Sequence, residues 1–276
     1  MLTAGDDYPL HQRPEPIAYA GTDRNFYDRY FFNGQTADGS LFFAAALGVY
    51  PHLDIMDAAF AVLADGVHRS VFASRILAGE RMATAVGPIS VEVLEPLKRL
   101  RVRLQATEGL AADLVCTGRH RPVEEPRFTR RIGSRTLMDS TRMTQNVTWE
   151  GTLSLDGTTH DGRLLAGTRD RSWGVRPVGA PDSQPPPAPP QFYWLWAPMQ
   201  FGDFALFAHT NDDATGEPWN RSAVLVDCLH DREEKLRDPM FRIRHTPGTR
   251  RAADAVLEAR RQDGTPVVAT LTPHAH

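Results

Sequence analysis

The densest group of side chains able to do chemistry lies in residues 167–174, with the sequence GTRDRSWG. Alternate side chains of an extended segment point to opposite sides, so Arg169 and Arg171 are expected on one side and Asp170 on the other. An aspartate in an apolar pocket has a raised pKa and can act as a general acid near neutral pH, whereas one paired with arginine stays ionised. The segment therefore predicts either an acid–base centre at Asp170 or a salt-bridged corner, and both interpretations stay open.

Two neighbouring residues extend this group. Trp173 is expected on the side of the two arginines, where it can contact a ligand or fill the core. Arg176 adds a third guanidinium group, and the three arginines together could hold a ligand carboxylate or hydroxyl by charge-assisted hydrogen bonds. We therefore treat all of these residues as candidates for substrate binding.

A second candidate region is the aromatic segment 192–196, FYWLW. On alternation Trp194 and Trp196 share a face and Tyr193 lies opposite. Such an aromatic wall can line an apolar cavity or fill a barrel. His209, near the end of the next expected strand, is either a proton shuttle or a structural histidine. Tyr193 and His209 are accordingly candidates to assist Asp170.

The front of the chain supplies a third group, with Tyr27 inside the stretch 25–34 and Tyr50 further on. Both tyrosines could contact a ligand, and a packed aromatic cluster would explain them equally well. The sequence contains no nucleotide-binding glycine motif, no G-x-S-x-G elbow and no H-E-x-x-H motif. Its two cysteines have no zinc-ligand spacing. We expect no cofactor and no metal.

The elements that position these residues are predicted to be antiparallel strands. Residues 40–50 are apolar at both parities, which favours a strand buried on both faces. Residues 89–95 and 101–105 alternate as hairpin partners do. Five Asp-Gly pairs punctuate the chain, and this dipeptide favours type I′ hairpin turns. Residues 252–261 fit either a helix or a strand of a hairpin.

Composition and charge limit the class of protein. The 276 residues are 41% hydrophobic and 24% charged, which is typical of a folded globular chain. A net charge of −3 gives no general attraction to nucleic acid. Because neither an apolar leader nor a stretch of about 18 apolar residues is present, we expect no membrane span and a cytoplasmic location.

The domain organisation follows from composition breaks. Residues 1–22 have no periodicity and are predicted to form an arm on the surface. A first β domain is expected over residues 23–130 and a second over 131–276. The proline-rich residues 181–190 are predicted to be a stiff surface loop within the second domain, because proline cannot donate to a strand ladder.

The combination of residues 167–174, the aromatic 192–196 segment and the Gly202-Asp203 turn resembles the AttH and carotenoid 1,2-hydratase-like superfamily. Residues 27–34, 48–51 and 56–57 resemble an uncharacterised bacterial branch of it. The likeness spans roughly residues 23 to 270, and its most specific part is the D-x-x-W-G pattern that starts at Asp170.

This resemblance implies an all-β fold of two lipocalin-like antiparallel barrels or sandwiches packed side by side, with a ligand site toward their interface. Members include hydratases that protonate an isoprenoid double bond through an acid in this motif, and relatives that guide cyclisations. By position, Asp170 would be the acid, Trp173 its supporting neighbour, and Tyr193 and Trp194 would line the pocket, where aromatic faces stabilise a carbocation. The flanking arginines depart from the hydratase pattern.

The early end of the chain after Val268 also departs from that pattern. A missing terminal strand would leave a sheet edge for a partner to cover, which favours a homodimer.

The sequence thus predicts a cofactor-independent enzyme that acts on a hydrophobic small molecule, such as a terpenoid, a steroid or a polyketide-like compound. The reaction would be that of a lyase (hydratase or dehydratase) or of an isomerase or cyclase. The alternative is a non-catalytic lipocalin-like protein that binds a hydrophobic ligand. Folds host many functions, so the site has to decide between them.

Overall fold

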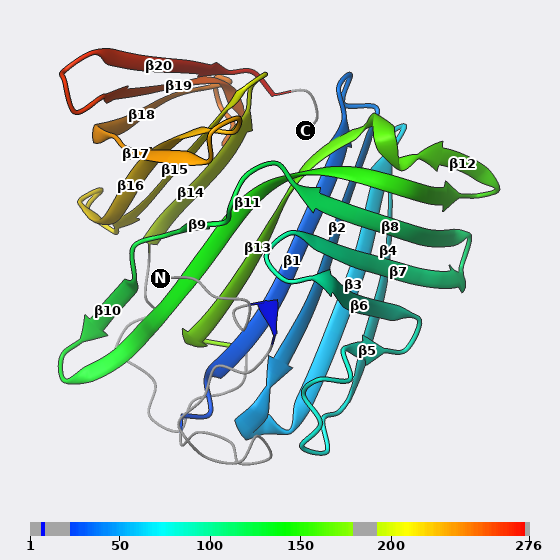
Figure 1. The fold of residues 1–276 in the computed structure, drawn as a ribbon. Coiled ribbons are helices and arrows are strands. Elements are labelled where there is room, and N and C mark those ends of the chain that lie inside the picture. The colour runs from blue at the N-terminus through cyan, green and yellow to red at the C-terminus, as the bar shows by residue number, and fades with distance from the viewer. Residues whose placement is uncertain (1–6, 9–22, 179–191, 274–276) are drawn as a thin grey trace. The chain divides into compact units, whose positions relative to one another are not determined.

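The computed structural model describes residues 7–8, 23–178 and 192–273 (Figure 1). The chain divides into two compact units, Met1–Ala188 and Pro189–His276. Antiparallel sheets of 13, 4 and 3 strands account for nearly all of the regular structure, and the described residues contain no α-helix. None of the described helical turns is long or apolar enough to cross a membrane.

The first unit is built on the 13-stranded sheet. Its strands run in the order β4-β3-β2-β1-β13-β11-β8-β7-β6-β5, and β9, β10 and β12 pair with β11. The bounds are β1 (Phe26–Thr36), β2 (Leu41–Tyr50), β3 (Ile55–Ala64), β4 (Val67–Ile76), β5 (Ala85–Val86), β6 (Ile89–Glu95), β7 (Arg99–Thr107), β8 (Leu110–Gly118), β9 (Val123–Glu124), β10 (Phe128–Ile132), β11 (Arg135–Leu155), β12 (Thr158–Asp161) and β13 (Leu165–Val175).

This sheet buries one face around a single apolar core. The core draws side chains from β1, β2 and β3 and from β6, β7, β8 and β11, so the two ends of the sheet bend toward each other. Trp149 of β11 is part of this core. Its ring meets the Phe43 ring edge to face, with the two centroids 5.0 Å apart, and its indole N–H donates to the Asn33 carbonyl at 3.0 Å. No pairing joins β4 to β5, and the sheet therefore stays open.

The expected fold class is confirmed as all-β and antiparallel. The predicted barrels are not observed, because none of the three sheets formed by the described strands closes into a barrel. The expectation that residues 40–50 are buried on both faces is also wrong, because Leu41, Phe43 and Ala45 are buried while Phe42 is exposed and Ala44 half-buried. Alanines 44 and 46 point away from the core, and because they are apolar the segment looked like one buried on both faces.

The second unit carries the other two sheets. One contains β14 (Phe192–Gln200), β15 (Phe204–Asp213), β16 (Pro218–Asp227) and β17 (Arg232–Lys235), and the other contains β18 (Arg237–His245), β19 (Ala252–Arg260) and β20 (Pro266–Leu271). Both sheets contribute to one apolar core, for example through Leu206 and Leu257. Residues 252–261 form a hairpin strand rather than a helix.

The division between units differs from the expected boundary at residues 130 and 131. It falls after Ala188, because β11 pairs with β8 and β13 pairs with β1, which keeps both strands in the first sheet. The proline-rich residues 181–190 lie outside the described residues. Of the expected surface arm, only Asp7 and Tyr8 are described, and the surface assignment is wrong for Asp7, whose side chain is fully buried.

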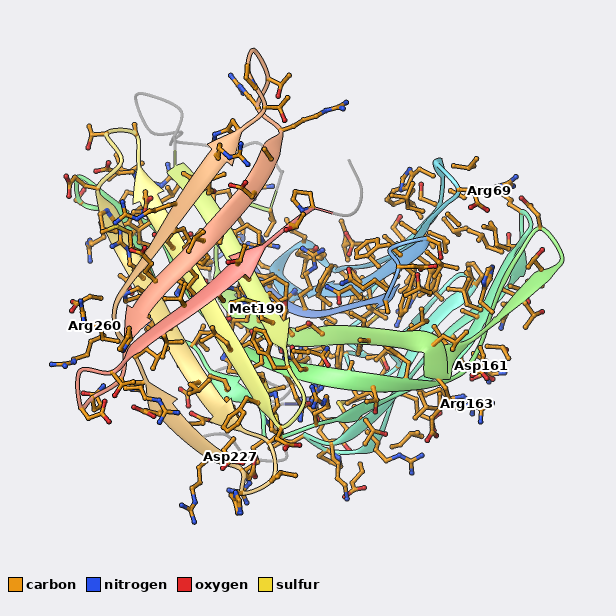
Figure 2. All side chains as sticks on the ribbon, turned by 90° about the horizontal axis from the view of Figure 1, so that it is seen from above. Arg69, Asp161, Arg163, Met199, Asp227 and Arg260 are labelled. Atoms are coloured by element: carbon orange, nitrogen blue, oxygen red, sulfur yellow. The ribbon has the colours of Figure 1, made fainter. Side chains whose placement is uncertain are left out.

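Two of the Asp-Gly pairs have the backbone that type I′ turns require. Asp65 and Asp156 have φ values of 50° and 51°, and the glycine after each is also left-handed. Asp161 instead has φ −77° and accepts a hydrogen bond from the Arg163 amide at 2.9 Å, next to an ion pair of the same two residues at the sheet's edge (Figure 2). The Asp-Gly dipeptide thus predicted where the chain turns back more reliably than it predicted a type I′ turn.

Candidate functional site

β13 runs between β1 and β11 near the middle of the large sheet and presents its side chains alternately to two faces. Arg171 lies on the core face, where its guanidinium stacks on the Tyr30 ring with the carbon 4.1 Å from the ring centroid. Arg169 shares that face, and Asp170 projects from the other. The split of the segment into a basic side and a separate aspartate is therefore confirmed.

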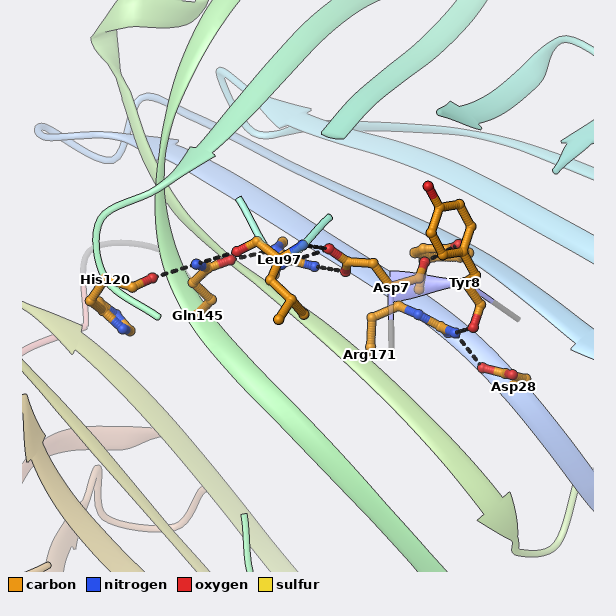
Figure 3. A network of polar contacts seen from close by, with 9 residues as sticks. Asp7, Tyr8, Asp28, Leu97, His120, Gln145 and Arg171 are labelled. Carbon is orange, nitrogen blue, oxygen red and sulfur yellow. Dashed lines mark hydrogen bonds and ion pairs between the residues drawn. The ribbon is translucent and has the colours of Figure 1, made fainter. Parts of the chain in front are cut away.

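The two arginines on the core face are paired with acids from other parts of the chain. The Arg169 guanidinium contacts the Asp7 carboxylate at 2.6 Å, and that of Arg171 contacts Asp28 at 2.5 Å (Figure 3). The Arg169 and Arg171 side chains are only 1% and 0% exposed. Neither pairs with Asp170, so the salt-bridged corner expected around Asp170 does not form.

Further hydrogen bonds complete this buried polar cluster. Arg171 donates to the Tyr8 carbonyl at 2.9 Å, and the Tyr30 hydroxyl donates to the Asp7 carbonyl at 2.5 Å. Burial raises the pKa of Tyr30, which keeps its hydroxyl protonated and able to donate. The geometry gives Arg169 and Arg171 partners within the chain, and their assignment as ligand anchors stays a prediction that would require these pairs to open.

Trp173 is on the same face as these arginines. It pairs in register with Asp28 of β1 and Thr141 of β11, and alternation places it opposite Asp170. The structure therefore does not place the Trp173 side chain beside the Asp170 carboxyl, although the two residues are only three positions apart.

Asp170 is buried between Phe31 of β1 and Thr144 of β11, its cross-strand neighbours. The side chain is 8% exposed, and its carboxylate accepts no hydrogen bond and forms no ion pair with the residues that the structure describes. Burial raises the pKa of Asp170 to about 6, against the opposing attraction of Arg142 and Arg29. A carboxyl with this pKa is partly protonated near neutral pH and can both give and take a proton.

Arg142 does not cancel that effect because a different acid holds it. Its guanidinium donates to Glu125 at 2.7 and 2.9 Å and lies over the Phe128 ring. Glu125 also accepts a hydrogen bond from the Thr144 hydroxyl at 2.6 Å, and its charge pushes the pKa of Asp170 up. The cation with the largest effect on the pKa of Asp170 is thus itself paired with a buried carboxylate.

A second titratable pair lies on the same face, two strands beyond β1. Asp57 of β3 and Arg29 of β1 both pair in register with Gly48 of β2. A Cβ atom at Gly48 would lie 2.6 Å from the Tyr50 hydroxyl and 2.8 Å from Asp57 Oδ1, so the two side chains meet over this glycine and share a hydrogen bond. Burial raises the pKa of Asp57, and Arg29 opposes the rise.

Two arginines connect the pair to Asp170. The positive charges of Arg29 and Arg176 lower the pKa of both Asp170 and Asp57, so both carboxyls lie within the electrostatic range of the same two arginines. Arg176 is positioned by Tyr27, with its guanidinium carbon 4.5 Å from the centroid of this buried ring. We call this set the Asp170 face; its members are Asp170, Arg29, Arg142, Arg176, Glu125, Tyr27, Tyr50 and Asp57.

Gly48→Ala tests the contact between Tyr50 and Asp57. The new methyl group would overlap both polar atoms, which are the ends of side chains and can move, so we expect a stability change within about 1 kcal/mol. Loss of the tyrosine hydrogen bond should raise the pKa of Asp57 further, because that bond stabilises the ionised carboxylate. Carbon-13 NMR titration of labelled aspartate would measure it, and an unchanged titration would contradict the contact.

The aromatic segment in the second unit is only partly assembled as expected. The rings of Trp194 and Trp196 stack with centroids 6.3 Å apart, and Trp196 pairs in register with His209. Tyr193 lies on the opposite face of β14 and is 46% exposed. His209 is buried and shares a 2.6 Å hydrogen bond with Asn220. Tyr193 and His209 therefore project from opposite faces of one sheet.

Of the sequence candidates, the structure brings Asp170, Arg176, Tyr27 and Tyr50 to one face of one sheet. Participation of Tyr193, His209, Trp194 and Trp196 in the same site stays a prediction. Sequence reasoning missed Glu125 and Arg142, two members of the Asp170 face. Arg29 and Asp57 lay within or near the third candidate region but were given no role. No group of three or more His, Cys, Asp or Glu side chains in the described ranges is placed to hold a metal ion.

The defining sequence pattern of one protein family, described as a family of unknown function (DUF8625), matches residues 2–276. The chain belongs to DUF8625. No curated protein matches its sequence.

The solved structures that share the fold of this chain include an AttH-like protein and a hydratase. The crystal structure assigned to AttH from Nitrosomonas europaea superimposes with a TM-score of 0.54 at 14% identity, covering 96% of this chain and 97% of that one. Kievitone hydratase from Nectria haematococca gives a TM-score of 0.51 at 12% identity, covering 88% of this chain and 86% of the hydratase. The resemblance to the AttH and carotenoid hydratase-like superfamily is thus confirmed at the level of the fold.

Proposed function

We propose that the Asp170 face is a proton-transfer site, and that the protein is a cofactor-independent hydratase, dehydratase, isomerase or cyclase of a hydrophobic small molecule. The observation that carries the proposal is the environment of Asp170: a buried carboxyl without a hydrogen-bond partner in the described chain, whose pKa burial raises to about 6. A general acid works best when its pKa is near the operating pH. The flanking arginines do not hold Asp170 ionised, because they pair with Asp7 and Asp28.

The neighbouring side chains suit an apolar substrate. Next to Asp170, the same face presents Phe31 and, on β2 and β3, a row of half-buried alanines at 44, 46, 59 and 61. Small side chains leave the backbone accessible to a flat hydrocarbon, and an aromatic ring can stabilise a nearby carbocation. The name of kievitone hydratase, which shares the fold, also supports a hydration reaction.

One carboxyl group is sufficient for the proposed reaction, because it can both donate a proton and take one back. Protonated Asp170 gives its proton to one carbon of a double bond, whose π electrons form the new C–H bond and leave a cation on the adjacent carbon. Water adds to that cation in a hydration, or a second double bond adds in a cyclisation. The proton released by the water or by the cyclised cation returns to the Asp170 carboxylate. Dehydration is the reverse sequence.

The test uses deuterated water and a defined panel of three compounds. Linalool and α-terpineol each contain isoprenoid double bonds or ring alkenes together with a tertiary alcohol, and squalene contains isoprenoid double bonds alone. Mass spectrometry should detect deuterium incorporation or product formation with the wild-type protein. Asp170→Asn should lower the rate by about 10²- to 10⁴-fold, the usual contribution of a general acid. Asp113→Asn is the matched control, because Asp113 pairs with Arg101 at the surface of the sheet. Turnover that survives Asp170→Asn would refute the proposal.

The alternative is a binding protein without turnover, favoured by the positive charge of Arg29 and Arg176 on the Asp170 face. These guanidinium groups can hold a ligand oxygen by charge-assisted hydrogen bonds. Equilibrium binding of the panel compounds by titration calorimetry separates the two functions. Binding that is lost in Arg29→Gln but unchanged in Asp170→Asn, without any deuterium exchange, would select the binding protein.

A further inference from the structure

The carboxylate of Asp7 is held on the core face by groups that are remote in sequence. Arg169 Nη1 contacts Asp7 Oδ1 at 2.6 Å, and the main-chain N–H of Leu97 donates to Asp7 Oδ2. These contacts span 162 and 90 positions of the chain. We call the Arg169 guanidinium and the Leu97 N–H the carboxylate cradle.

Contacts that do not involve Asp7 hold the cradle in place. Arg169 Nε donates to Gln145 Oε1 at 2.6 Å, and Gln145 Nε2 donates to the carbonyls of Leu97, at 3.0 Å, and His120 (Figure 3). Gly118 gives this amide its room, because a Cβ atom there would collide with Gln145. One side chain therefore orients both donors of the cradle.

The backbone at Leu97 supports a specialised role for its N–H group. Leu97 has φ 64°, in the left-handed region that residues with a Cβ atom seldom adopt, and it lies in the turn between β6 and β7. Such strain persists where surrounding structure enforces it, and it is concentrated at ligand clamps and functional sites. Here it accompanies an amide that donates to a buried carboxylate.

The buried positive charge of Arg169 requires a negatively charged partner beside it. Arg169 and Arg171 are buried on the core side of the sheet and pair with Asp7 and Asp28. Arg81 is buried as well, and the charge of Asp28 acts on it. Loss of the Asp7 carboxylate would leave Arg169 buried without its acid, and a buried charge is strongly unfavourable unless it is paired. A free anion that can enter should therefore bind there.

The surroundings specify the kind of anion. Burial raises the pKa of Cys116 to about 11, and Arg169 acts against that rise, so this neutral thiol lies near the cradle. Tyr30 also contacts the Asp7 segment and belongs to the apolar core. One negative charge on a small apolar body therefore fits a site that combines one guanidinium with these apolar neighbours.

We propose that the carboxylate cradle is a binding site for small monocarboxylates, which Asp7 occupies as a tethered ligand of the chain itself. The site is separate from the Asp170 face, which is on the opposite side of β13, and it does not depend on the function proposed for that face.

The experiment is chemical rescue of Asp7→Ala by acetate, followed by thermal unfolding of the full chain. The variant should lose roughly 6 °C or more in Tm, because it leaves a buried guanidinium without its carboxylate. Sodium acetate should restore at least half of that loss, whereas sodium chloride at equal ionic strength and neutral acetamide should not. Asp113→Ala, which breaks a surface ion pair, is the control and should not respond to acetate.

Titration calorimetry measures acetate binding directly. It therefore tests the proposal even if Asp7→Ala has the same Tm as the wild type. If Asp7→Ala is partly unfolded, sodium acetate should raise its folded fraction in circular dichroism, whereas sodium chloride at equal ionic strength should not. Acetate binding to the Asp7 variant that exceeds binding to Asp113→Ala supports the cradle. Acetate that neither binds nor stabilises any Asp7 variant, or that acts equally on the Asp113 control, would overturn the proposal and leave the Asp7 contact as a structural ion pair.

Discussion

Asp170→Asn is expected to make the folded protein more stable at pH 8, by up to about 3 kcal/mol. The pKa of Asp170 is about 6 in the folded chain and 3.8 in the absence of structure. Because the folded pKa is the higher one, the protonated acid favours folding, and this stability is complete below pH 4 and lost as the pH rises through 6. Asparagine resembles the protonated acid at every pH, so the variant avoids that loss.

Urea unfolding at pH 4 and pH 8 measures the effect. Wild type and Asp170→Asn should be nearly equal in free energy of unfolding at pH 4 and should diverge at pH 8. Asp113→Asn is the matched control, because Arg101 lowers the pKa of Asp113 and its replacement should bring no gain at pH 8. An Asp170→Asn protein that is less stable than wild type at pH 8 would show that Asp170 is a paired structural carboxylate.

The same substitution is expected to remove turnover while it adds stability. This combination is typical of active-site residues, where the environment needed for chemistry is unfavourable for folding. A purely structural aspartate would lose stability on replacement and would have no specific effect on the deuterium exchange assay.

Arg171→Met should have the largest effect on folding, a loss of about 3–5 kcal/mol in the free energy of unfolding. Arg171 is fully buried, and it contacts Asp28 at 2.5 Å, the Tyr8 carbonyl at 2.9 Å and the Tyr30 ring. Methionine fills similar space but leaves the Asp28 carboxylate buried without this partner. Urea unfolding at pH 7 provides the measurement.

Two further variants separate charge from packing. Arg163→Met breaks the surface pair with Asp161 and should change the free energy of unfolding little, since the arginine is 77% exposed. The double variant Arg171→Met with Asp28→Leu removes both charges and should recover much of the loss, because apolar pairs often replace buried ion pairs without penalty. If Arg171→Met costs no more than Arg163→Met, the buried pair contributes little.

Much of the local structure was predictable because it depends on near neighbours. The strand alternation of β13 separated Asp170 from Arg169 and Arg171, and four of the five Asp-Gly pairs marked chain reversals, the exception being Asp161-Gly162. Both follow from backbone geometry within a few residues. The domain boundary was not predictable in this way, because the pairing of β13 with β1 joins segments that are far apart in the chain.

The site itself shows the same limit. Asp57 and Arg29 became part of it because each pairs with Gly48 from a neighbouring strand. The register of these hairpins depends on the exact geometry of their loops, which the sequence analysis did not assign residue by residue. Glu125 entered through its contacts with Arg142 and Thr144. Asp7 was assigned to a surface arm because its neighbours in sequence have no periodicity, and only its partner Arg169 explains its burial.

The sequence by itself thus determined that Asp170 stands between two arginines on an extended strand and projects away from them. Only the tertiary structure decided which acids those arginines bind and whether Asp170 has a partner. The pairing of Arg169 with Asp7 and of Arg171 with Asp28 leaves Asp170 in a buried position with a pKa of about 6. The physical reason is that a carboxyl's pKa depends on burial and on charges brought near by folding, which its own segment does not contain.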